Sequence, residues 1–111
     1  MNSLKNKVQL IGNLGDDPKL QDLESGKQVT RFSLATNESY KNGEGELVTD
    51  TQWHTIIAWN KTAELICKFL KKGSEVAIEG SLSYKNFEDK NNQKKYVTEI
   101  NCHEFLVLKN K

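Results

Sequence analysis

The chain has 111 residues, of which 36% are hydrophobic and 28% are charged, a composition typical of one soluble domain with a single core. Its formal net charge of +1 neither favours nor excludes a nucleic-acid partner. The amino-terminal residues contain no apolar stretch of signal-peptide length, and no run approaches a membrane span. We therefore expect a cytoplasmic protein of one domain.

Hydrophobic periodicity predicts five strands and one helix. In chain order they are strands over Lys7–Leu14, Gln28–Glu38 and Thr51–Trp59, a helix over Lys61–Lys72, and strands over Glu75–Tyr84 and Tyr96–Leu108. Turns are predicted around Gly15 and Gly26, and polar loops over 41–47 and 85–95 read as the tips of two hairpins. Alternating apolar residues predict the core: Val8, Leu10, Leu14, Val29, Phe32, Leu34, Val76, Ile78 and Leu82.

The predicted helix has recognisable signals at both ends. Asn60 is a candidate N-cap, Lys71 and Lys72 suit the negative end of the helix dipole, and Gly73 is placed to end the helix. Apolar residues recur at helical spacing between these ends: Leu65, Ile66, Phe69 and Leu70.

This order of elements favours one fold class. Three strands, a helix and two further strands is the chain order of the OB-fold, a five-stranded Greek-key barrel with one α-helix between strands 3 and 4. Gly12 and Gly80 lie in the middle of predicted strands, where a curving barrel strand needs them. A mainly β protein is therefore expected, although an α+β sheet covered by one helix would give a similar pattern.

The two tryptophans raise the question of function. Trp53 and Trp59 are six residues apart on one predicted strand, so both indoles lie on the same face of that strand. Periodicity leaves two readings open, because neither face of the strand is clearly polar. The rings either fill the core, as large aromatics usually do, or stand outside it as a platform for flat ligands.

The remaining aromatic residues divide into two groups. Phe32, Phe69 and Phe105 lie in apolar periodic contexts and are expected in the core, while Tyr96 stays undecided. Tyr40, Tyr84 and Phe87 lie in or next to polar hairpin sequence. Lys41 follows Tyr40, and Lys85 lies two residues before Phe87. Exposed rings beside ammonium groups are what single-stranded nucleic acid binds, since bases stack on rings and phosphates meet lysines.

Catalytic and metal-binding motifs are weak. Cys67 and Cys102 form no CxxC pair and read as small buried hydrophobes. The chain contains no P-loop and no supported nucleophile set, and Glu88 and Asp89 read as solvated charge at a loop tip. We expect no enzyme activity, no metal and no cofactor.

Several motifs together resemble those of the bacterial single-stranded DNA-binding protein family. They appear in family order and span nearly the whole chain: "NKVQLIGNLGDDP", "FSLATNESY", "TQWHTIIAWNKTAEL", "FLKKGSEVAIEGSL" and "YKNFEDKNNQKKYVTEI". The resemblance implies an OB-fold protein that coats single-stranded DNA with little sequence preference in replication, recombination and repair. It also implies a homotetramer, with no membrane partner, acting in the bacterial cytoplasm at the nucleoid.

The resemblance also assigns roles to individual residues. The positions matching base-stacking rings of the family are Tyr40, Trp53, Trp59 and Phe87. The positions matching its basic residues near the strand path are Lys7, Lys61, Lys71, Lys72 and Lys85. Thr55 and Ser83 stand where the family often has arginine, so the phosphate track is expected to be thinner here.

Three points remain open on the sequence alone. Family members usually continue into a flexible linker and an acidic tail that recruits replication and repair proteins, whereas this sequence ends in "FLVLKNK". Recruitment through such a tail is therefore not expected of residues 1–111. His54 lies either at a subunit contact or in a hydrogen bond within the sheet. An OB-fold interaction module without base stacking is the rival function.

Overall fold

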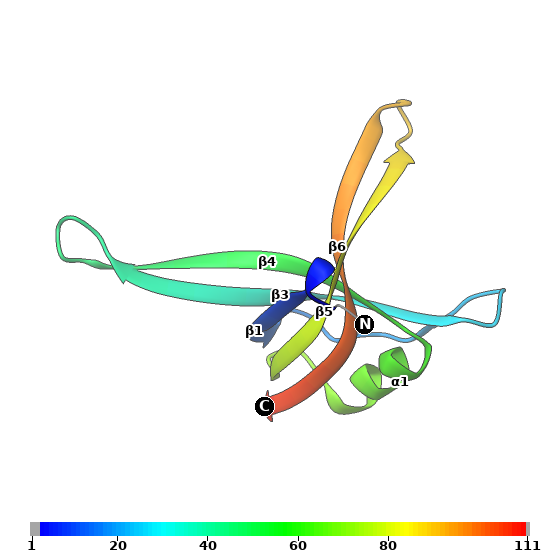
Figure 1. Ribbon diagram of the computed structural model, residues 1–111, viewed down its shortest axis with the longest axis horizontal. Coiled ribbons are helices and arrows are strands. Elements are labelled where there is room, and N and C mark those ends of the chain that lie inside the picture. Colours follow the sequence, from blue (N-terminus) through cyan, green and yellow to red (C-terminus); the bar gives the residue numbers. More distant parts are fainter. Residues whose placement is uncertain (1–2, 111) are drawn as a thin grey trace.

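A computed structural model describes residues 3–110 of the chain (Figure 1). A short 3-10 helix, Ser3–Lys5, precedes the strands. The elements that follow are β1 (Val8–Leu14), β2 (Gln21–Asp22), β3 (Gln28–Lys41), β4 (Leu47–Trp59), α1 (Asn60–Phe69), β5 (Glu75–Glu88) and β6 (Lys94–Lys109). Among these residues, no helix has both the length and the apolar character needed to cross a bilayer.

The strands form a closed barrel. Their order in the sheet is β1-β5-β6-β4-β3-β2, and an additional antiparallel pairing of β1 with β3 closes the ring. The two-residue β2, which the sequence pattern did not predict, only adds an edge to β3. With β2 set aside, five strands make the barrel and α1 connects the third to the fourth, which confirms the predicted OB-fold.

The interior of the barrel is apolar. Leu34, Ile56 and Val76 are fully buried, and Ile66 of α1 joins them from one end of the barrel. Helix α1 packs against β3, β4 and β6 and lies below the barrel in Figure 1. The predicted core residues Leu14, Val29, Phe32, Leu34, Val76 and Ile78 are buried, Val8 and Leu10 pack partly against the core, and Leu82 is exposed.

The helix is shorter than predicted. Its N-cap is Trp59 rather than Asn60, which has φ 52 and accepts a hydrogen bond at its Oδ1 from the Gln28 N–H at 3.1 Å. The predicted Asn60 cap and the boundary at Lys72 were therefore wrong. After Phe69 the chain becomes extended at Leu70, which is buried.

Side chains from other segments explain why the helix ends early. The Lys71 N–H donates to Ser74 Oγ at 3.1 Å, and the Lys72 N–H donates to Asp17 Oδ1 at 2.7 Å. These acceptors take the place of helix carbonyls. Phe69, expected in the core, is 50% exposed in the last helical turn, and the Lys68 Nζ lies 5.5 Å from its ring centroid.

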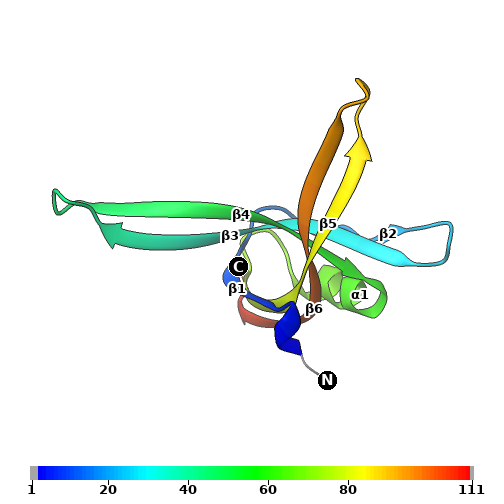
Figure 2. The same cartoon turned by 45° about the horizontal axis from the view of Figure 1, so that its top comes forward.

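Two long hairpins leave the barrel. Both strands of each hairpin extend beyond the predicted ends, so the loop expected over 85–95 shrinks to the residues between Glu88 and Lys94. The hairpins β3–β4 and β5–β6 project in different directions in both views (Figures 1 and 2). We call them the first arm and the second arm.

Two glycines allow the barrel to bend as predicted. A Cβ at Gly12 would overlap the Ala35 carbonyl oxygen, and one at Gly80 would overlap the carbonyl oxygen of Asn101. The β5–β6 register also shifts between Glu79 and Gly80. Backbones therefore approach at these points more closely than any side chain would permit.

Candidate nucleic-acid interface

The two tryptophans stand on the outside of the barrel. Along β4, Ile56 and Ala58 point into the core, so the alternate residues Trp53, Thr55, Ile57 and Trp59 point outward. Trp53 is 62% exposed, and Trp59 is partly buried. Neither indole belongs to the buried core, so the core reading of the two tryptophans is excluded.

Strand registers place several other residues on the same side. Ile57 lies opposite Arg31 of β3 and opposite Asn101 of β6, which in turn lies opposite Ser81 of β5. Paired residues share a face of the sheet. We call this side the outer face; it carries Arg31 and Ser33 on β3, Trp53, Thr55, Ile57 and Trp59 on β4, Ser81, Ser83, Lys85 and Phe87 on β5, and Glu99 and Asn101 on β6.

Phe87 and Tyr40 occupy different positions relative to this face. Phe87 is 51% exposed on the second arm and follows Lys85 by two residues, so it continues the outer face. Tyr40 is 49% exposed on the first arm and lies opposite Val48. It is an even number of residues from Leu34, whose side chain points into the core, so both side chains lie on the same face of β3. The structure therefore brings Trp53, Trp59 and Phe87 to one face and places Tyr40 on the other side of its arm.

The five predicted lysines are dispersed. Lys61 lies in the first turn of α1, and Lys71 and Lys72 lie in the turn that follows the helix; all three are exposed and form no ion pair within residues 3–110. Lys7 Nζ lies 3.0 Å from Glu79 Oε1, and Lys85 Nζ lies 3.5 Å from Glu99 Oε1.

A polar hollow adjoins the Trp53 ring. It is lined by Gly15, Asp16, Asp17, Lys19, Arg31 and Lys72. Asp16 Oδ1 accepts the N–H of Ser33 at 2.9 Å and its hydroxyl at 3.1 Å, while Asp17 binds the Lys72 backbone, so both carboxylates hold the loop in place. The three cationic side chains of the hollow are exposed, and the hollow meets the indole at Gly15, against which the Trp53 ring packs.

His54 and the two cysteines occupy different environments in the fold. His54 Nε2 forms a 2.9 Å hydrogen bond with Thr36 Oγ1 on the neighbouring strand, as one of the two readings expected. Cys102 is buried, and burial raises the pKa of its thiol to about 11, whereas Cys67 is partly buried. The described part of the chain holds no cluster of three or more His, Cys, Asp or Glu residues suited to a metal ion.

Comparison with known proteins identifies the family. The sequence model that describes the single-strand binding protein family matches residues 5–108 of the chain. The chain belongs to this family. The resemblance inferred from the sequence motifs is thus confirmed.

Individual single-strand binding proteins align over most of the chain. Single-stranded DNA-binding protein 1 of Chlorobaculum tepidum is 46% identical over 104 residues, which are 93% of this chain and 64% of that protein. The Xylella fastidiosa protein of the same name is 39% identical over 93% of this chain and 76% of its own length. The chain thus spans about two thirds of the first relative.

A solved structure shares the fold. A Plasmodium falciparum SSB in complex with ssDNA superposes with a TM-score of 0.85 at 36% identity, covering 98% of both chains. The aligned region includes almost the whole chain.

Sequence reasoning missed two exposed cations and one buried acid of this single-strand binding domain. Arg31 and Lys19 line the hollow, and Glu99 is a buried acid on the outer face. The outward direction of Arg31 could have been predicted, because it directly precedes the predicted core residue Phe32 and successive strand residues point to opposite faces. Tyr84 and Tyr96 are 70% and 72% exposed on the side of the second arm opposite Phe87.

Proposed function

We propose that this domain binds and coats single-stranded DNA with little sequence preference. The observation that carries the proposal is the Trp53 indole, which is 62% exposed on the outer face and adjoins a hollow lined by Lys19, Arg31 and Lys72. A ring beside cations suits a strand whose bases stack while its phosphates are neutralised. The similarity to a Plasmodium falciparum SSB in complex with ssDNA supports the same function.

The residues proposed for this binding are those that the sequence singled out. Bases stack on Trp53, Trp59 and Phe87 of the outer face and on Tyr40 at the other side of the first arm, at about 1–3 kcal/mol per base. Phosphates are neutralised by Lys7, Lys61, Lys71, Lys72 and Lys85. Neither kind of contact reads base edges, so sequence preference is expected to be slight.

The wider role follows from that activity. We propose that residues 1–111 act as one non-catalytic DNA-binding domain, without metal or cofactor, in replication, recombination and repair. Its proposed location is the bacterial cytoplasm, at the nucleoid. Recruitment of replication and repair proteins is not assigned to these residues.

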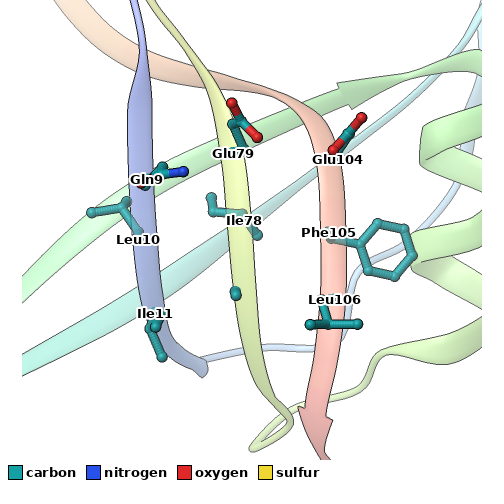
Figure 3. A pocket seen from close by; sticks show the side chains of 9 residues that line it. Gln9, Leu10, Ile11, Ile78, Glu79, Glu104, Phe105 and Leu106 are labelled. Carbon is teal, nitrogen blue, oxygen red and sulfur yellow. The ribbon is translucent and has the colours of Figure 1, made fainter.

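We further propose a homotetramer, which an exposed apolar surface supports. On the side of the barrel formed by β1, β5 and β6, Ile11, Ala77 and Leu106 lie in one row across the strands (Figure 3). Ile11 and Leu106 are 61% and 64% exposed. Exposed apolar patches of this kind are typical of protein–protein contacts.

The edge of β1 supports assembly as well. Residues 8–12 of β1 pair with β5 on one side, and the pairing with β3 begins only at Asn13. The other edge of residues 8–12 pairs with no strand in the described part of the chain, so a strand from a second copy could pair there. Edge pairing and face packing together provide two contacts per chain, as a tetramer requires.

Titration of tryptophan fluorescence with oligo-dT tests the proposed function. We expect strong quenching that saturates at a stoichiometric amount of DNA, because stacked bases quench an exposed indole. If the folded protein shows no change in tryptophan fluorescence or in electrophoretic mobility when oligo-dT is added, the rival function, an interaction module without base stacking, is favoured.

A further inference from the structure

Arg31 is the only arginine of the chain, and it occupies the middle of the outer face. Its Nε donates a hydrogen bond to Glu99 Oε2 at 2.8 Å. The Arg31 side chain is 47% exposed, whereas the Glu99 side chain is only 5% exposed. The guanidinium is therefore held from below by a buried carboxylate and is open to solvent above.

The same carboxylate meets a second cation. Lys85 Nζ lies 3.5 Å from Glu99 Oε1, an oxygen that has no hydrogen-bond partner within the described residues. A buried carboxylate is costly unless it is paired, so Glu99 holds the two cations near it. We call Arg31, Glu99 and Lys85 the charge cluster. Because Arg31 lies on β3 and Lys85 lies on β5 in the second arm, the charge cluster links these two strands across the outer face.

Within residues 3–110, Arg31 uses only one of its donors in a hydrogen bond. A guanidinium has five N–H donors, and the bond to Glu99 uses the one on Nε. Arg31 also lines the hollow with Lys19 and Lys72, next to Gly15, against which the Trp53 ring packs. Arg31 and the Trp53 ring therefore border the same glycine and lie on the same face of the sheet.

We propose that Arg31 is a phosphate-binding residue of the outer face and that Glu99 is its positioning residue. This inference rests on the proposed single-stranded DNA binding and adds a contact that the lysine pattern does not include. Glu99 fixes the direction of the guanidinium through Nε and leaves the planar fork of terminal amino groups for a phosphate. A fork held in place binds phosphate oxygens in pairs and loses less side-chain entropy on binding.

The first experiment measures affinity for oligo-dT at several salt concentrations for the wild type, Arg31→Gln and the matched control Lys68→Gln. Lys68 is an exposed cation on α1 that the outer face does not include. We expect Arg31→Gln to weaken binding several-fold and to reduce the slope of log K against log salt by about 0.7 for each protomer that contacts the strand. Lys68→Gln should change neither quantity.

The second experiment separates charge from position at Glu99. Glu99→Gln keeps an oxygen acceptor for Nε and removes the negative charge, so it should bind DNA at least as tightly as the wild type. Glu99→Ala removes the acceptor and should weaken binding toward the level of Arg31→Gln. In the double variant Arg31→Gln/Glu99→Ala, no further loss is expected, because the two residues act through one contact.

The outcomes distinguish the inference from the function on which it rests. A wild-type protein that does not bind oligo-dT overturns the proposed function itself. Binding by the wild type with an Arg31→Gln slope equal to that of Lys68→Gln overturns the phosphate contact. If Arg31→Gln binds oligo-dT weakly while Glu99→Ala binds it as tightly as the wild type, the positioning role is overturned. If Glu99→Ala does not fold, the positioning role is overturned by a Glu99→Gln variant that binds oligo-dT as weakly as Arg31→Gln.

Discussion

The Trp53 indole packs against Gly15 and uses the space that a side chain there would need. A Cβ at Gly15 would lie 2.5 Å from Trp53 Cζ3 and 2.6 Å from Ser33 Oγ. The ring is therefore supported from beneath by bare backbone while 62% of the residue faces solvent. A rigid support of this kind limits the movement of the exposed ring, which suits the proposed stacking.

Gly15→Ala should displace the indole and weaken binding to oligo-dT. The methyl group clashes with the ring and with Ser33, so Trp53 must rotate away from the hollow, and up to about 1–3 kcal/mol of stacking is lost. Fluorescence titration measures both the emission of the free protein and the affinity. The control is Gly43→Ala, whose Cβ would meet nothing within 4 Å. Equal effects of the two substitutions would contradict the proposed support.

Removal of each tryptophan should have a different result. Trp53 is largely exposed, so Trp53→Ala should leave the thermal unfolding temperature nearly unchanged and should cost about 1–3 kcal/mol of binding. Trp59 is partly buried, so Trp59→Ala should also destabilise the fold, by about 1–3 kcal/mol. Unfolding curves and oligo-dT titrations of both variants test this. Loss of stability in Trp53→Ala with full DNA affinity would contradict the assignment.

The fold was largely predictable because the core pattern is strong. Phe32, Leu34, Val76 and Ile78 alternate along their strands, and all four are buried. The ends of elements were less predictable. The arms continue through polar residues that pair along the backbone, and hydrophobic periodicity does not register such pairing.

The wrong helix end and the unpredicted pairing of Arg31 with Glu99 have a common origin in long-range contacts. Helix α1 ends at Phe69 because Leu70 turns into the core and Asp17 binds the Lys72 N–H from 55 residues away in sequence. Arg31 and Glu99 are 68 residues apart, so their pairing was not visible in local sequence. Tyr40 and Phe87 were noticeable because aromatic residues in polar hairpins are unusual, whereas roles for Trp53 and Trp59 came from the family resemblance. A single arginine on a strand gives no comparable signal of a binding role.

Phe87→Ala and Tyr96→Ala form a matched pair on the second arm. Both rings are exposed, at 51% and 72%, but they lie on opposite sides of the arm. Phe87→Ala should weaken oligo-dT binding by about 1–3 kcal/mol, because it removes a ring from the outer face. Tyr96→Ala should bind nearly as well as the wild type. An equal or greater loss for Tyr96→Ala would mean that DNA follows the other side of the arm.

Leu106→Glu should disrupt the proposed tetramer. Leu106 is 64% exposed in the apolar row with Ile11, so the single chain tolerates the carboxylate, whereas a packed interface does not. Sedimentation velocity should show a smaller species for this variant than for the wild type. Leu47→Glu is the control, since Leu47 is 71% exposed at the end of the first arm. An unchanged sedimentation coefficient for Leu106→Glu would remove this face from the assembly.

The buried thiol of Cys102 should make the protein less stable in alkaline solution. Burial disfavours the thiolate and raises the pKa of Cys102 from its ordinary value of 9.0 to about 11, so the unfolded chain loses this proton at lower pH than the folded chain does. The resulting contribution to stability is complete below about pH 9 and is lost as the pH rises to about 11; it amounts to at most about 3 kcal/mol. Urea unfolding at a series of pH values measures it, with Cys102→Ala as the variant and Cys67→Ala as the control. The wild type and Cys67→Ala should lose stability relative to Cys102→Ala across this range, and parallel curves for all three proteins would show that the Cys102 thiol does not contribute.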